Sequence, residues 1–228
     1  MSFHTLVLLT TATLAASVDC KWDYDTQEIS CPNHLYVDRI TGKEVPVKYH
    51  TSPFSRPLEG DTEDKAQYYE HDDSRKDQNG TASFSYFFNM GRNVGMDSIL
   101  EKDGCKETIG DDPSDPLKGP SAAFQRDDNR DFKCHRIAGD IKNPDNVVVG
   151  PLENDNPAAG FFMTVMGGDD CSDTWRGDSG GYTKRSMTYR VFCDTSSEGV
   201  AKLPDFETIR EDLTCMCTCE LLLFFLFV

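Results

Sequence analysis

Apolar and polar residues alternate most clearly in the segment SMTYRVFCD, residues 186–194. Its odd-numbered positions are all apolar and its even-numbered positions are mostly polar, which is the period of a β-strand with one buried face. Shorter apolar runs bounded by turn residues occupy residues 82–89, 146–150 and 160–168. Because no stretch keeps a helical period, the pattern predicts an all-β chain whose strands close as a flattened barrel or sandwich.

Two long polar segments separate these runs, at residues 59–80 and 110–131. Both are acidic and rich in residues that favour turns, with few side chains able to build a core. We predict that they are long loops or disordered insertions. The whole of residues 19–219 is then a single domain, and no internal repeat divides it.

The N-terminal residues 1–18 have the layout of a secretory signal peptide. An apolar run at 6–16 follows a short polar start, and small residues occupy positions 15–17. The run is too short to span a bilayer. We expect cleavage near Val18 or Asp19, and therefore residence in the lumen of the secretory pathway (endoplasmic reticulum, Golgi or endosome) or secretion.

The C-terminal residues 220–228 form an apolar tail that is also too short to cross a bilayer. It has two interpretations. The tail is either a buried terminal strand, or it marks a truncated domain end or gene-model artefact. In the second case the natural protein continues differently, and a membrane anchor of a type I membrane protein is missing from this sequence.

Net charge and cysteine content argue against several classes of function for this protein. The formal charge of −16 argues against nucleic-acid binding, because phosphate recognition needs a basic surface. In an oxidising compartment cysteines are typically disulfide-bonded, and no Cys-x-x-Cys pair has a partnering Cys/His pair, so we expect neither a metal site nor a cofactor. Asn79 begins an Asn-Gly-Thr glycosylation sequon. The cysteines are residues 20, 31, 105, 134, 171, 193, 215, 217 and 219.

The segment RGDSGG, residues 176–181, matches two unrelated motifs. Gly-Asp-Ser-Gly-Gly surrounds the nucleophile of trypsin-like serine proteases, which would make Ser179 catalytic. Such an enzyme needs a histidine base and a buried aspartate. His50 lies upstream, but its setting VKYHTSP lacks the residues that surround that histidine. We therefore expect no enzyme, and we interpret the Arg-Gly-Asp tripeptide as a polar turn at a hairpin tip rather than an adhesion motif.

Five segments carry recognisable motifs: GFFMTVMGGDDC (160–171), RSMTYRVFCD (185–194), LPDFETIREDLTC (203–215), SYFFNMGRN (85–93) and FKCHRIAGD (132–140). The first contains a Gly-Gly-x-x-Cys stretch, and the second is an Arg-Ser strand that ends in Phe-Cys-Asp. Weaker signals are a Tyr-x-x-Asn segment and the segment around Cys134. Together, over about residues 20–215, these segments resemble the mannose 6-phosphate receptor homology (MRH) domain.

The resemblance implies a flattened β-barrel that binds mannose-type or phosphomannosyl N-glycans through a Gln, an Arg, a Glu and a Tyr. Arg185 fills the Arg position, and Glu211 fills the Glu position with Asp212 as a near competitor. The Gln position after Cys134 holds His135, and Gln125 is the alternative. The Tyr position holds Cys217.

The same resemblance implies the disulfides. They are Cys20–Cys31, Cys105–Cys134, Cys171–Cys215, and Cys193 with either Cys217 or Cys219. On this basis the partner is mannose-containing glycoprotein cargo. The alternative is a non-lectin MRH domain of an autophagy-related or trafficking membrane receptor, in which the sugar-binding quartet is not kept.

The protease interpretation has a direct chemical test. Because Ser179 has no identified base, a serine-directed fluorophosphonate probe is expected to leave the protein unlabelled. The measurement is mass spectrometry of the peptide that contains Ser179, with trypsin treated in parallel as the positive control. Labelling of Ser179 would restore the enzyme hypothesis.

Overall fold

The computed structural model describes residues 20–38, 40–56, 68–77, 80–95, 99, 102, 104–106, 119–127, 134–169, 184–194, 205–211 and 218–226. Its strands fall into three sheets, so the all-β class expected from the alternating pattern is confirmed. Within the described ranges, no helix has the length and apolar character needed to cross a membrane. The expected signal peptide lies outside these residues.

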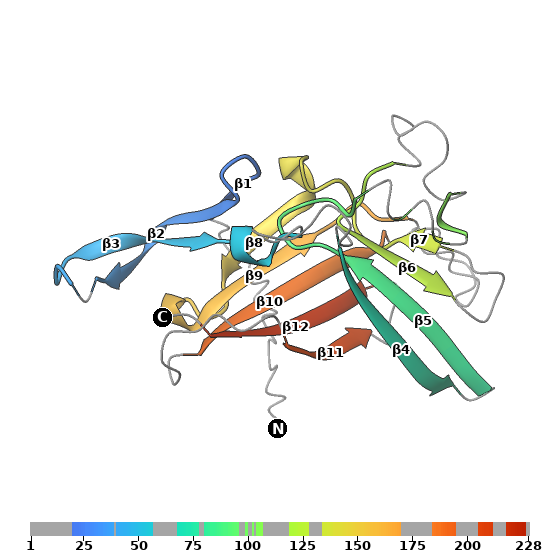
Figure 1. Ribbon diagram of the computed structural model, residues 1–228. Helices are drawn as coiled ribbons and strands as arrows, with labels where there is room; N and C mark the ends of the chain where they lie inside the picture. Colours follow the sequence, from blue (N-terminus) through green and yellow to red (C-terminus); the bar gives the residue numbers. More distant parts are fainter. Residues whose placement is uncertain are drawn as a thin grey trace, which may run out of the picture.

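The smallest sheet has the order β1–β2–β3 and forms an antiparallel hairpin with one short added strand. Figure 1 shows the β2–β3 hairpin extending away from the rest of the molecule. Its base joins the body through Tyr49, whose hydroxyl donates to Pro157 O at 2.8 Å and whose ring lies 5.0 Å from that of Phe161. The strands are β1 (Lys21–Asp23), β2 (Glu28–Val37) and β3 (Glu44–His50).

The second sheet has the order β4–β5–β6–β7 and is antiparallel throughout. The third has the order β11–β12–β10–β9–β8 and is antiparallel except for the parallel pair β10–β12. The strands of the second sheet are β4 (Tyr69–Asp77), β5 (Gly80–Phe88), β6 (Ala123–Asp127) and β7 (Cys134–Arg136). Those of the third are β8 (Val147–Pro151), β9 (Gly160–Val165), β10 (Ser186–Asp194), β11 (Asp205–Glu211) and β12 (Thr218–Leu226).

One hydrophobic core joins all three sheets. The alternation in 186–194 places Met187, Tyr189 and Val191 in this core, as expected for a strand with one buried face. The β5 strand is buried on both sides, because Tyr86 and Phe88 enter the main core while Phe87 enters a second, smaller cluster. The three sheets do not close into a barrel, so the expectation of a flattened barrel is wrong in that respect.

Strands also occur where the sequence predicts long loops. β4 lies within 59–80 and pairs with β5 from Tyr69 opposite Phe88 to Asp77 opposite Gly80. β6 lies within 110–131, between β5 and β7. Sheet hydrogen bonds join backbone groups, so a polar sequence can form a strand beside an apolar neighbour. The stacked rings of Tyr69 and Phe88, 5.6 Å apart, anchor that pairing.

The apolar tail forms β12, which lies between β10 and β11 in the third sheet. Its pairing with β10 runs in register from Ser186 opposite Thr218 to Asp194 opposite Leu226. The backbone of residues 218–226 is therefore placed as a strand, whereas its side chains lie outside the described part of the molecule, so both interpretations of the tail stay predictions.

The described residues contain two disulfides, Cys20–Cys31 and Cys105–Cys134, and they are two of the pairs implied by the resemblance. The first links the chain before β1 to β2. The second ties the segment before β6 to β7, and both its sulfurs belong to the smaller core cluster. The other expected pairs involve Cys171, Cys215 or the side chains of Cys193 and Cys219, which lie outside the described part of the molecule, as does Cys217.

The turn of the β2–β3 hairpin is organised by Asp38. Its carboxylate accepts hydrogen bonds from Thr41 Oγ1 at 2.6 Å and from the Ile40 N–H at 2.9 Å. These hydrogen bonds, that of Thr41 foremost, lower the pKa of Asp38 below its ordinary value. Gly42 completes the turn with φ of +66°, in the left-handed region that glycine adopts without strain.

The hydroxyl of Tyr189 connects the third sheet to the second. It lies 3.2 Å from Asn89 O and 3.3 Å from Ala122 O, at the ends of β5 and β6. Tyr189→Phe keeps the ring but removes this buried donor, so we expect a free energy of unfolding lower by about 1–2 kcal/mol. Urea denaturation followed by circular dichroism measures the change. Tyr24→Phe, in a partly buried ring beside Lys142, is the matched control and is expected to leave stability nearly unchanged.

Candidate ligand-binding site

Three polar side chains meet between the second and third sheets. Arg185 Nη1 donates to Gln125 Oε1 at 2.8 Å, and Gln125 Nε2 donates to Tyr86 Oη at 3.1 Å. Gln125 and Tyr86 are buried, whereas Arg185 is half-buried. These three residues form the Tyr86–Gln125–Arg185 cluster.

Strand register brings the first two together. Tyr86 on β5 lies directly opposite Gln125 on β6, so their side chains leave the same face of the sheet. The same row continues to His71 on β4 and to His135 on β7, which are the direct partners of Tyr86 and Gln125. Both histidines are half-buried.

Arg185 directly precedes β10 of the third sheet, and backbone hydrogen bonds hold it in place. Its carbonyl oxygen accepts from the Gly168 N–H at 3.0 Å, and its N–H donates to Asp169 O at 3.0 Å. The adjacent Asp169 N–H donates to Arg136 O at 2.9 Å, so a single short segment contacts both Arg185 and the end of β7. The Arg185 side chain is thereby fixed opposite Gln125.

The carboxylate of Asp169 strengthens this link. Oδ2 accepts from the Arg136 N–H at 2.8 Å, and Oδ1 lies 3.0 Å from Arg136 Nε in a partly buried ion pair. Asp169 therefore neutralises Arg136. Arg185, in contrast, forms no ion pair with a carboxylate of the described residues.

Glycines at 167 and 168 allow the two sheets to approach this closely. A Cβ on Gly168 would lie 2.4 Å from Ile137 O and 2.7 Å from Arg136 O, both backbone atoms. Gly167 has φ of +84° and forms an isolated bridge with Ala138. The Gly-Gly stretch recognised in the sequence is thus a contact between sheets as well as a turn.

One hydrogen-bond donor of the cluster is not used within it. Arg185 Nε is buried and has no hydrogen-bond partner among the described residues. A guanidinium carries five N–H donors, and a buried unpaired one costs free energy until an acceptor reaches it. The arrangement suits a ligand rich in oxygen acceptors, such as vicinal hydroxyls or an anionic group.

The structure describes some of the site residues predicted from the sequence, and others lie outside the residues it describes. Of the two candidates for the Gln position, Gln125 is the residue bonded to Arg185, while His135 is its neighbour across the β6–β7 pairing. Glu211 ends β11 opposite Cys219, but its side chain, like Asp212, Cys217, Ser179 and Asn79, lies outside what the structure describes. Tyr86 was missed by the sequence reasoning. Its signal was a tyrosine within the aromatic run 82–89.

The described part of the chain contains no group of three or more His, Cys, Asp or Glu side chains placed to hold a metal ion. No protein-family model matches the chain, and no curated protein matches it. The site must therefore be interpreted from its own geometry.

The ion pair of Asp169 with Arg136 is expected to stabilise the junction of the two sheets. Asp169→Ala removes two acceptor contacts and leaves a partly buried guanidinium without its carboxylate, so the free energy of unfolding should fall by about 1–3 kcal/mol. Thermal and urea denaturation measure this. Asp155→Ala, at an exposed position, is the matched control, and equal stability of the two variants would contradict a structural role for the ion pair.

Proposed function

We propose that this chain is a glycan-binding module that recognises mannose-type N-glycans, including phosphomannosyl glycans, on glycoproteins of the secretory or endosomal pathway. The observation that carries the proposal is the hydrogen bond between Arg185, which fills the Arg position of the MRH resemblance, and Gln125, which is the alternative to His135 for the Gln position. Gln125 is proposed to fill the Gln position of that family, and the Tyr86 hydroxyl beside it accepts a hydrogen bond from the Gln125 amide.

The chemistry of these groups supports the proposal. Sugar hydroxyls both donate and accept hydrogen bonds, and an amide offers both functions in a fixed plane. The guanidinium of the half-buried Arg185 adds donors in a planar fork. Tyr86 holds the Gln125 amide in one orientation, so less rotational entropy is lost on binding.

The localisation belongs to the same proposal. Disulfides form and persist in oxidising compartments, so Cys20–Cys31 and Cys105–Cys134 favour an extracytoplasmic environment. Mannose-bearing glycoproteins occur in that environment. The proposed roles are therefore cargo binding or sorting in the lumen, or binding after secretion.

The test is binding of the full chain, produced with its disulfides formed, to a glycan array that contains high-mannose and phosphomannosyl structures. Arg185→Ala is expected to weaken binding by about tenfold to a hundredfold, because hydrogen bonds to charged groups are worth roughly 1.5–3 kcal/mol. Titration calorimetry with the best glycan quantifies the loss. Arg190→Ala is the matched control, since Arg190 is an exposed arginine on β10, the strand that begins directly after Arg185.

The outcomes separate the alternatives. Loss of affinity with Arg185→Ala but not with Arg190→Ala supports the proposed site. A correctly folded chain that binds no mannose glycan would contradict the lectin function and leave the non-lectin trafficking domain. Binding that survives Arg185→Ala would place the glycan at another surface.

A further inference from the structure

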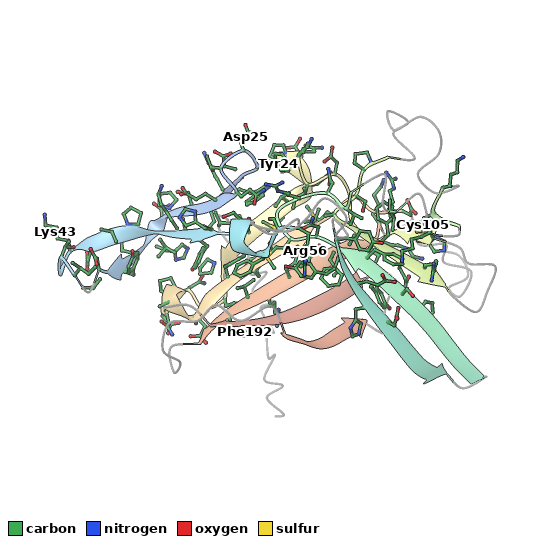
Figure 2. All side chains as sticks on the ribbon, viewed as in Figure 1. Tyr24, Asp25, Lys43, Arg56, Cys105 and Phe192 are labelled. Carbon is green, nitrogen blue, oxygen red and sulfur yellow. A yellow bond between two sulfur atoms is a disulfide. The ribbon has the colours of Figure 1, made fainter. Side chains whose placement is uncertain are left out.

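The outer part of the β2–β3 hairpin is a two-stranded ribbon without a covering layer. β1 pairs with β2 only at Glu28–Ser30, so residues 32–46 continue as two strands and a turn. We call residues 32–46 the arm. Figure 2 shows Lys43 at its far end, well away from the body of the molecule. An isolated two-stranded hairpin is marginally stable in water, which makes this arm a structure that benefits from a partner.

The arm carries most of the exposed large hydrophobic side chains of the described residues. Four of the five lie on it, and the fifth is Met166. Leu35, Tyr36 and Val37 are consecutive on β2, with exposed fractions of 49%, 45% and 59%, and Ile40 in the turn is 94% exposed. Consecutive strand residues point to opposite faces, so both faces of the arm present apolar surface.

The backbone directions show which edge of the arm is open. The Asp38 N–H donates across the hairpin to Lys43 O at 2.9 Å. Backbone groups alternate in direction along a strand, so Tyr36 also faces β3, whereas the N–H and C=O groups of Leu35 and Val37 point outward. No described residue outside the hairpin pairs with them.

The opposite edge is blocked by a proline. Tyr36 lies opposite Val45, and Leu35 lies opposite Pro46. By the same alternation the backbone of residue 46 points outward from β3, where proline has no N–H to donate. Proline is a common means of blunting an edge strand. The β2 edge of the arm carries no such block at Leu35 or Val37.

We propose that two copies of this chain associate by antiparallel pairing of their β2 edges, about a two-fold axis that passes between the two Tyr36 residues. In this register Leu35 of each copy lies opposite Val37 of the other, and these are the residues whose backbone groups point outward. The regular pairing then covers residues 35–37 of each copy, between the irregular stretch 32–34 of β2 and the hairpin turn that begins at Asp38. The arrangement is closed and self-complementary, as two-fold interfaces are.

Charge also favours a second copy as the occupant of this edge. The whole chain has a net charge of −16, which opposes association over most of its surface. Residues 28–50 hold three acidic residues (Glu28, Asp38, Glu44) and three basic ones (Arg39, Lys43, Lys48), so this hairpin is neutral. Two copies can therefore meet at this hairpin without repulsion between net charges of the two hairpins. The proposal does not depend on glycan binding.

A disulfide trap tests the register. Opposite residues that do not exchange hydrogen bonds across an antiparallel pair have Cα atoms about 4.5 Å apart, a distance that a disulfide spans. In the full chain, Tyr36→Cys is expected to give a covalent dimer on mild oxidation, with the residue 36 peptides cross-linked to each other in mass spectrometry. Lys48→Cys, exposed on the other strand of the same hairpin, is the matched control and is expected to remain monomeric under the same conditions.

Sedimentation of the unmodified chain supplies the independent measurement. We expect a concentration-dependent dimer, and Leu35→Pro should weaken the association at least tenfold because it removes an outward-pointing donor without touching the β2–β3 hydrogen bonds. Glycan binding or circular dichroism of the monomeric variant confirms that it is folded. A chain that stays monomeric at its solubility limit, a dimer that resists Leu35→Pro, or equal cross-linking at residues 36 and 48 would each overturn the proposal. Binding of a different protein to the monomeric chain at this edge would overturn it as well.

Discussion

The close contact between residues 167–169 and the end of β7 is the constraint on which the candidate site depends. At Gly168 the backbones of the two larger sheets approach so closely that a methyl group would collide with two carbonyl oxygens. The following residue, Asp169, binds Arg136 on one side and the backbone of Arg185 on the other. If this contact shifted by the width of one side chain, the arginine of one sheet would no longer reach the glutamine of the other.

The fold class followed from the sequence because its signal is local. In 186–194 the alternation of apolar and polar residues predicts which side chains are buried, and Met187, Tyr189 and Val191 enter the core as that pattern requires. β4 was not predictable in this way. Its sequence is polar, and it forms a strand because it pairs with the aromatic β5. That pairing cannot be inferred from the β4 segment alone.

The candidate site was partly predictable for the same reason. Arg185 and Gln125 were identified from a resemblance in linear sequence, but Tyr86 joins them only through the register of β5 and β6. The choice between Gln125 and His135 could not be made from the sequence, because the two residues are direct partners on neighbouring strands. Their separation along the chain gives no indication that they lie opposite each other on neighbouring strands. The hydrogen bond from the Arg185 side chain to Gln125 distinguishes the two in the structure.

The position of β12 has a consequence for the order in which the third sheet is completed. β11 precedes β12 in the chain, yet it touches the sheet only through β12, which lies against β10. β11 therefore cannot dock until the later strand has occupied the edge of β10, and a growing chain exposes that edge until residue 226 has left the ribosome. Parallel pairing between such distant segments closes a large loop before it gains any contact, which makes it a slow step. During biosynthesis, the open side of β10 is an unpaired strand edge of the kind that chaperones protect.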